Sequence, residues 1–401
     1  MSARSGVALA APPPAWDSIA GEQLLPFDFQ PLNRVIAGPG VLQRLDEAVQ
    51  SLGGQRVLLV TDPGLEQAGH PQRAQAILEA AGLKVALFDG VKENPTEREV
   101  EAGTEFARSH QIDCIVAVGG GSAMDCAKGI NFLLTNGGRM SDYKGFGKAS
   151  RPMLPSIGVP TTAGTGSEAQ SYALITDEKT HLKMACGDRK AAFRIVLLDP
   201  ELTLTQPQQV TAATGIDAIA HAVESFVCTR RNAFSQMLSR TAWHLLSQHF
   251  ETVLREPRHL PARWNMLLGA HLAGMAIENS MLGICHSCAN PLTAHYGITH
   301  GVAIGIMLPH VIRFNGEWVE PLYAELLAHE YGGKQRATDQ LVERTLRFTQ
   351  AAGLPQSLRD CGVSRTILPL LAEEAHQQWT ARFNPRPVTE NDLLRVYEAA
   401  W

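Results

Sequence analysis

The first half of the chain alternates short apolar runs with longer segments whose apolar residues recur at helical spacing. Four runs rich in β-branched residues predict buried strands: RVLLV (56–60), VALF (85–88), CIVAV (114–118) and IGV (157–159). Between them, PQRAQAILEAAG (71–82) has helical spacing and ends on glycine. This alternation predicts a parallel sheet with helices on its faces. IVLLDP (195–200) is the last strand expected, closed by Pro200.

After residue 200 the pattern becomes helical. Long apolar periodicities run through QQVTAATGIDAIAHAVESFV (208–227), residues 233–256 and residues 264–279. Thr389 stands three residues before Asp392, which is the spacing of a helix capping box. We therefore expect a dinucleotide-binding α/β domain over 24–200 and an all-helical domain over 201–401. Residues 1–23, where three prolines follow a short apolar patch, are expected to form a disordered tail.

Composition narrows the classes of function. A chain of 401 residues exceeds a single core and indicates two domains. The net charge of -5 provides no general basic field, so nucleic acid is not an expected partner. No apolar run approaches the roughly 18 residues that span a bilayer, so no membrane is expected either. Seven scattered cysteines, an odd number, indicate reduced thiols in a cytoplasm.

Two polar loops follow predicted strands in the first half. VGGGSAMD (118–125) leads from CIVAV into an apparent helix, where successive glycines and free N–H groups suit a pyrophosphate. It lacks the third glycine of the usual dinucleotide fingerprint, so a plain strand-to-helix turn remains an alternative. PTTAGTGSE (160–168) follows IGV and suits the ligand crevice of an open sheet, or else a mobile surface loop.

Asp62 comes directly after the strand RVLLV. A carboxylate at this place accepts hydrogen bonds from adenosine ribose hydroxyls and repels a 2′-phosphate, which favours NAD over NADP. The alternative is an ordinary turn or helix-cap residue.

The second half supplies metal-ligand candidates. In GIDAIAHAVE, Asp217 and His221 are four residues apart in a helical pattern and share one face. A polar stripe on an exposed face is the alternative, but the neighbouring residues are apolar, and polar groups in such a setting need a partner. The pair plus two further histidines would complete a four-ligand site.

The stretch CHSCANPLTAHYGITH (285–300) contains five more metal-binding side chains: Cys285, His286, Cys288, His295 and His300. Pro291 and Gly297 are expected to break the helix between His286 and His300. Cys285 and Cys288 form a C-x-x-C spacing, but no second such pair completes a structural zinc site, which favours small core residues. Spacing alone does not decide whether His295 lies at the surface or behind the ligands.

Taken together, these motifs resemble the iron-containing (group III) alcohol dehydrogenases. The resemblance runs from about Asn33 to Trp401 and rests on GGGSAMD, PTTAGTGSE, GIDAIAHAVE, CHSCANPL, THGVAIGIMLPHVIRFN and NPRPVTENDLLRVYEAAW, in that order. It implies a dehydroquinate synthase-like fold, in which an N-terminal nucleotide-binding α/β domain precedes an all-helical metal-binding domain and the active site lies between them.

The resemblance also assigns residues. The metal ligands it implies are Asp217, His221, His286 and His300, the last within T-H-G where the family usually has P-H-G. The nucleotide contacts it implies are Asp62, Asn94, Gly120, Gly121, Ser122, Thr161 and Thr162, with Lys183 reaching the nicotinamide ribose. One position departs: the family's second histidine of H-x-x-x-H-P, which serves in proton release, is Asn290 here. Asn cannot exchange a proton near neutral pH. Water and ribose hydroxyls, His295 or an altered activity are the explanations left open.

The implied activity is hydride transfer between a nicotinamide cofactor, NAD rather than NADP, and a small alcohol, aldehyde or ketone. Three imidazoles and one carboxylate suit Fe(II) but also Zn(II). A metal-dependent lyase on the related scaffold and a non-catalytic nucleotide-binding relative are the alternatives; the lyase would need clustered Lys and Arg for a phosphorylated substrate. The family precedent suggests a homodimer or larger assembly.

Overall fold

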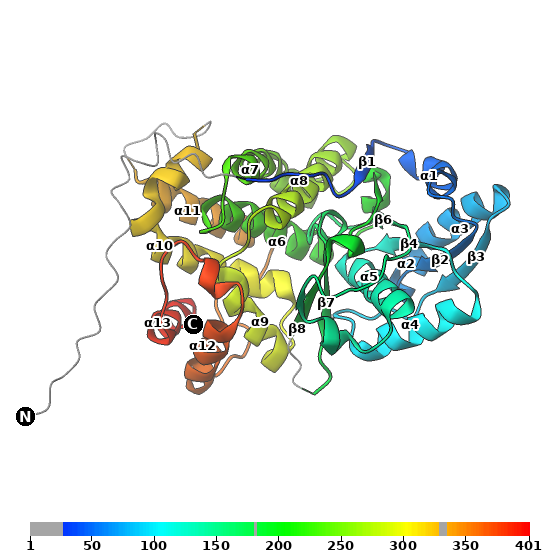
Figure 1. Ribbon diagram of the computed structural model, residues 1–401. Helices are drawn as coiled ribbons and strands as arrows, with labels where there is room; N and C mark the ends of the chain where they lie inside the picture. The colour runs from blue at the N-terminus through cyan, green and yellow to red at the C-terminus, as the bar shows by residue number, and fades with distance from the viewer. Residues whose placement is uncertain (1–26, 180–182, 329–334) are drawn as a thin grey trace, which may run out of the picture.

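The computed structural model describes residues 27–179, 183–328 and 335–401, and the tail expected over 1–23 lies outside the described residues. The strands of the described residues all precede residue 200, and a helical half follows (Figure 1). This arrangement confirms the predicted fold class, an α/β nucleotide-binding half followed by an all-helical half.

The main sheet is parallel and has six strands in the order β1-β9-β6-β4-β2-β3. The strands are β1 (Arg34–Ala37), β2 (Arg56–Val60), β3 (Lys84–Phe88), β4 (Cys114–Gly119), β6 (Ser156–Pro160) and β9 (Ile195–Leu198). All five predicted strands are present, although β9 ends at Leu198 and Pro200 begins a short 3-10 turn, η6 (Pro200–Thr203). The chain passes from β2 outward to β3 and returns on the other side of β2 as β4. Ligands of open α/β sheets bind at such a reversal, at the carboxyl ends of the strands.

Side chains alternate between the two faces of this sheet. Val57 and Leu59 pack with α1 (Leu45–Ser51) and α3 (His70–Ala80), whereas Leu58 and Val60 pack with α4 (Glu97–Ser109) and α5 (Gly121–Asn136). Because both faces are covered, the strands are apolar throughout, as the sequence pattern indicated. The remaining short elements of this half are α2 (Pro63–Ala68), η2 (Val41–Arg44), η3 (Met140–Tyr143), η4 (Ser167–Ala169) and η5 (Arg189–Ala191).

A second, smaller sheet was not anticipated from the sequence. It has the order β5-β8-β7 and comprises β5 (Gly145–Phe146), β7 (Tyr172–Thr176) and β8 (Lys183–Gly187), with β7 and β8 antiparallel. The alternate burial of YALIT along β7 is the period-2 signal of a half-buried strand. β1 was missed as well, because three of its four residues are exposed and leave no apolar run.

The helical half begins with α6 (Gln208–Val227), α7 (Ala233–Arg255) and α8 (Leu260–Glu278). It continues with α9 (Ile284–Tyr296), α10 (His300–Leu326), α11 (Ala337–Ala351), η7 (Arg365–Ile367), α12 (Leu368–Gln377), η8 (Ala381–Phe383) and α13 (Glu390–Ala400). The capping box at Thr389 is confirmed. α8 begins four residues before the predicted start, because Pro261 occupies its first turn, where a missing N–H costs nothing.

The expected break at Pro291 is wrong. α9 continues through Pro291 to Tyr296, and the break expected at Gly297 is confirmed, because Gly297 is the C-cap residue with a left-handed backbone (φ 63°). A proline inside a helix removes one backbone hydrogen bond, but the surrounding packing of α9, whose residues 284–289 are all buried, maintains the helix here.

The two halves share one apolar core and touch through backbone as well as side chains. A Cβ on Gly166, in the loop after β6, would lie 2.7 Å from Cα of Gly274 on α8, so this loop is pressed directly against the helical half. Ahead of β1, Phe29 packs on Phe234 of α7 with ring centroids 3.8 Å apart. At the Gly166 loop, the carboxyl edge of the sheet therefore lies against the helical half.

Candidate active site

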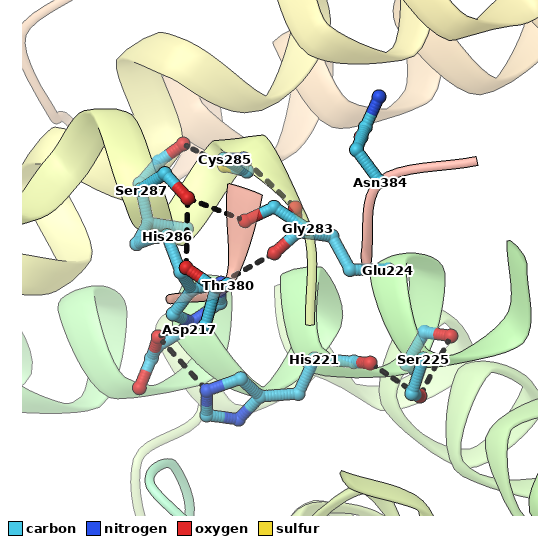
Figure 2. Close-up of polar contacts among 12 residues, drawn as sticks. Asp217, His221, Glu224, Ser225, Gly283, Cys285, His286, Ser287, Thr380 and Asn384 are labelled. Carbon is cyan, nitrogen blue, oxygen red and sulfur yellow. Dashed lines mark hydrogen bonds and ion pairs between the residues drawn. The ribbon is translucent and has the colours of Figure 1, made fainter. Parts of the chain in front are cut away.

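The four metal-ligand candidates come together in the helical half. Asp217 and His221 lie one turn apart on α6, His286 lies in the first turn of α9, and His300 is the first residue of α10. Oδ1 of Asp217 lies 3.3 Å from Nε2 of His221, 3.3 Å from Nε2 of His286 and 3.7 Å from Nε2 of His300. Figure 2 shows the Asp217 carboxylate directed toward the His221 ring.

The ligand atoms of this cluster are buried and partly without partners, which suits a bound metal ion. One ligand atom from each of Asp217, His221 and His286 lies within 4.8 Å of the others, and all three side chains are buried. Among the described residues, Oδ1 of Asp217 and Nε2 of His286 have no hydrogen-bond partner. Buried polar atoms without a partner are costly unless something else occupies them. A divalent cation between the carboxylate and the imidazoles satisfies these atoms at once.

The electrostatics of Asp217, His221 and His300 in the metal-free cluster point the same way. Burial alone would raise the pKa of Asp217, but the surrounding imidazoles lower that pKa well below its usual range. Burial lowers the pKa of His221 to about 4 and that of His300 to about 3, so both rings are neutral at pH 7. Neutral imidazole and ionised carboxylate are the forms that bind metals.

Glu224 is a residue that the sequence analysis missed. Its Oε2 lies 2.5 Å from Nδ1 of His286, and its side chain is buried. Glu224 stands seven residues after Asp217 and three after His221, so the 3.6-residue period of GIDAIAHAVE places all three on one helical face. That spacing was the signal available in the sequence. Burial disfavours the charged form of His286, but Glu224 and Asp217 outweigh it and raise its pKa to about 9 in the absence of metal.

The nucleotide candidates gather at the carboxyl edge of the sheet. Asp62 follows β2, Asn94 follows β3, Gly120, Gly121 and Ser122 follow β4, and Thr161 and Thr162 follow β6. The N–H of Asn94 donates to Oγ of Ser122 at 3.2 Å, and the N–H of Thr161 donates to the Gly119 carbonyl at 3.0 Å. The two predicted loops are therefore in contact, beside the reversal between β2 and β4.

Glycines are required where these loops meet. A Cβ on Gly121 would lie 2.7 Å from Cγ2 of Thr165, and Gly120, the N-cap residue of α5, has no side chain with which to cap that helix. The first N–H groups of a 16-residue helix thus lie at the sheet's ligand edge, where they suit a phosphate. Asn94 has a left-handed backbone (φ 53°), which is unusual for a residue other than glycine and often marks a functional turn.

Asp62 has the helix-cap role that its position suggested as the alternative reading. It is the N-cap residue of α2, where its Oδ1 accepts the N–H of Leu65 at 3.2 Å. Its other oxygen, Oδ2, would lie 3.5 Å from a Cβ on Gly119, at the end of β4. Burial raises the pKa of this carboxyl, while hydrogen bonds from the backbone of α2 oppose the rise.

Lys183 links the two groups of candidates. It begins β8, and the charges of Asp125 and Asp217 act on it from the two halves. Burial lowers the pKa of Lys183, and the lysine in turn contributes to the low pKa of His300. The charges of Asp125 in the sheet half and of Asp217 in the metal-ligand cluster therefore both act on this side chain.

The remaining residues of the stretch 285–300 fall outside the cluster. Asn290, one turn after His286, donates from Nδ2 to Oε1 of Gln378 at 3.2 Å. His295 is nine residues after His286, about 13 Å along α9 and on its opposite side. Its ring binds Glu374 of α12 at 2.8 Å, which gives no support to His295 as a substitute proton relay. Cys285 and Cys288 are free and buried in the core, as predicted.

Comparison with known proteins decides the family. The model of the iron-containing alcohol dehydrogenases matches residues 32–200, and the model of the C-terminal part of the Fe-containing alcohol dehydrogenase family matches residues 211–401. The chain belongs to the iron-containing alcohol dehydrogenase family. The resemblance inferred from the motifs is thereby confirmed, and the protein is a metal-dependent oxidoreductase.

Individual relatives agree over most of the chain. The 1,3-propanediol dehydrogenase of Klebsiella pneumoniae is 35% identical over 382 residues, covering 94% of this chain and 99% of that protein. The NAD-dependent methanol dehydrogenase of Bacillus methanolicus is 30% identical over 370 residues, 91% of this chain and 97% of that protein. A solved structure of a 1,3-propanediol oxidoreductase matches with a TM-score of 0.91 and 34% identity, covering 94% of this chain and 100% of that one.

Proposed function

We propose that this dehydrogenase interconverts a small alcohol and its aldehyde or ketone with NAD as the hydride carrier and Fe(II) as the metal. The observation that carries the proposal is the buried cluster of ligand atoms in the helical half, in which Oδ1 of Asp217 and Nε2 of His286 have no hydrogen-bond partner among the described residues. The two family models support a dehydrogenase over the lyase and over a non-catalytic binder.

The metal ligands we propose are Asp217, His221, His286 and His300. Their support is the convergence of four Nε2 and Oδ1 atoms and the neutral state of His221 and His300 at pH 7. The bound metal supplies a Lewis acid for the substrate oxygen, and the nicotinamide exchanges the hydride. Zn(II) suits the same donors, and the family name favours iron.

The nucleotide site we propose comprises Asp62, Asn94, Gly120, Gly121, Ser122, Thr161, Thr162 and Lys183. The N-terminus of α5 is suited to the pyrophosphate, and the carboxylate of Asp62 to the adenosine ribose. The charge of Asp62 would repel a 2′-phosphate, which favours NAD over NADP. The NAD-dependent methanol dehydrogenase among the relatives supports the same choice.

Asn290 does not relay protons in this proposal. Its amide has no ionisation near neutral pH and is hydrogen-bonded to Gln378. The proton of the alcohol would then have to leave through water and the ribose hydroxyls of the cofactor. Among the described helices, none is both long and apolar enough to cross a bilayer. The seven free cysteines support a cytoplasmic enzyme, and the family precedent supports a homodimer or larger assembly.

An anaerobic assay tests the function. The purified protein is loaded with Fe(II) or Zn(II), mixed with NAD and screened against primary alcohols, diols and hydroxyacids while absorbance at 340 nm is followed. We expect NADH formation with at least one small alcohol, and none after the metal is removed with a chelator. Absence of NADH with every alcohol and both metals would contradict the proposal.

A further inference from the structure

Glu224 is a buried carboxylate that touches neither nucleotide loop. It is 4% exposed and lies on α6 within the same helical face as Asp217 and His221. An ionised carboxylate out of water is tolerated where it is paired and hydrogen-bonded. Both of its oxygens contact the start of α9, as Figure 2 shows for Glu224 beside Cys285 and His286.

One oxygen of Glu224 caps α9 from the neighbouring helix. Oε1 accepts the N–H of Cys285 at 2.8 Å, one of the first N–H groups of α9, which have no partner within the helix. The N-cap residue of α9 is Gly283, which has no side chain for this purpose. A Cβ on Gly283 would lie 2.9 Å from Oε1 of Glu224, so glycine leaves the space that the carboxylate needs. A negative charge at a helix N-terminus is also stabilised by the helix dipole.

The other oxygen of Glu224 fixes the ring of His286. Oε2 lies 2.5 Å from Nδ1, so this nitrogen carries the proton and donates it to the carboxylate. The opposite nitrogen, Nε2, is then left facing Oδ1 of Asp217 at 3.3 Å with no other partner among the described residues. We infer that Glu224 is a positioning residue that holds His286 in the tautomer and orientation required for metal binding, by joining its ring to the N-terminus of α9. The inference rests on the proposed metal site.

Glu320 provides a matched counterpart without a metal ligand. It lies on α10 and caps α11 from outside, because its Oε1 accepts the N–H of Ala337 at 2.6 Å and its Oε2 accepts that of Thr338 at 3.2 Å. Glu224 and Glu320 therefore perform the same capping task for a neighbouring helix. They differ in their other contacts: Glu224 contacts His286, whereas Glu320 contacts the Thr338 hydroxyl and Arg336. If Glu224 acts on metal binding through His286, a Glu224 variant will lose metal affinity and a Glu320 variant will not.

The test compares E224Q with E320Q in the full chain. Glutamine has one oxygen, so E224Q keeps the acceptor for either Cys285 or His286 but not for both. Metal-free protein is titrated with Zn(II) against a competing chelator, and thermal unfolding is recorded in parallel. We expect both variants to melt at lower temperature, but only E224Q to bind Zn(II) more weakly, by roughly 10–100-fold. Unchanged Zn(II) affinity in E224Q, or an equal loss in E320Q, would overturn the inference.

A second measurement covers the case in which E224Q does not fold. In the unsubstituted protein labelled with ¹⁵N-histidine, we expect the zinc-loaded form to show a slowly exchanging proton on Nδ1 of His286 and the metal-induced shift on Nε2. A metal-induced shift on Nδ1 would overturn the inference. If the unsubstituted protein binds neither Zn(II) nor Fe(II), the proposed function itself fails. If it binds Zn(II) and E224Q binds equally well, only the role of Glu224 fails.

Discussion

The two halves of the molecule build their candidate sites from different materials. At the sheet edge, backbone N–H groups, glycines and short side chains follow strand ends, and the turns themselves determine their positions. In the helical half, ionisable side chains from α6, α9 and α10 converge across distances of up to 83 residues along the chain. Turn geometry positions the first site, whereas helix packing positions the second. Substitutions should therefore damage the two sites in distinguishable ways.

The largest effect is expected from removing a metal ligand. H286Q deletes an imidazole from the cluster, so we expect metal content to fall below stoichiometric and kcat/KM to fall by about 10³-fold, since a Lewis acid contributes several kcal/mol. Nucleotide binding, which depends on the other half, should persist. Elemental analysis, steady-state kinetics and NADH fluorescence titration measure the three quantities. H295Q is the matched control on α9, because His295 pairs with Glu374 instead; an equal loss in both variants would refute this ligand assignment.

Substitution of a glycine in the nucleotide loop should weaken NAD binding and leave metal binding intact. G121A brings a methyl group against Thr165, and overpacking of this kind costs about 1–3 kcal/mol. We expect the Kd for NAD to rise by roughly tenfold, with the metal content unchanged. Isothermal titration with NAD and elemental analysis provide the readouts.

Rescue makes the test of Gly121 sharper. T165A removes the two atoms of Thr165, Cγ2 and Oγ1, that lie closest to the new methyl group. The double variant G121A/T165A should therefore recover part of the NAD affinity. If the metal content of G121A falls along with NAD affinity, the separation between the two halves is weaker than their geometry indicates.

Cofactor choice is expected to depend on a single charge. D62N keeps an N-cap acceptor for Leu65 but removes the negative charge, so the preference for NAD over NADP should shrink by about tenfold while stability is nearly retained. D62A loses the cap as well and should cost about 1 kcal/mol of unfolding free energy. Kinetics with both cofactors and denaturant unfolding separate the two roles. An unchanged preference in D62N would leave Asp62 as a cap only.

Some parts of the molecule could be predicted from local sequence patterns, and others could not. The spacing of Asp217 and His221 and the strand-end position of Asp62 are local, so the pattern located them correctly in α6 and after β2. His286 and His300 were assigned to the same cluster only through the family resemblance, because convergence between α9 and α10 depends on packing. The hairpin of β7 and β8 was missed because its strands are short and half-exposed, and the break expected at Pro291 was wrong because tertiary contacts override a local preference.

The smallest effects concern the pH dependence of the metal-free protein. Burial beside Arg313 lowers the pKa of His310, on α10, to about 4, below the usual value near 6.5. The unfolded chain then binds more protons between these values, so unfolding free energy decreases as pH falls from about 6.5 to 4. The raised pKa of His286, about 9, has the opposite sign: its contribution is complete below about pH 6.5 and is lost as pH rises toward 9.

Unfolding free energy plotted against pH thus has an acid limb, from His310, and an alkaline limb, from His286. Two variants separate the two limbs. Urea unfolding of the metal-free protein across this pH range should show a shallower acid limb in H310Q, which removes a buried imidazole, and a shallower alkaline limb in H286Q. His221 and His300 keep part of the acid limb in H310Q, because burial lowers the pKa of both. An alkaline limb that persists unchanged in H286Q would mean that the buried carboxylates Asp217 and Glu224 do not hold a proton on His286.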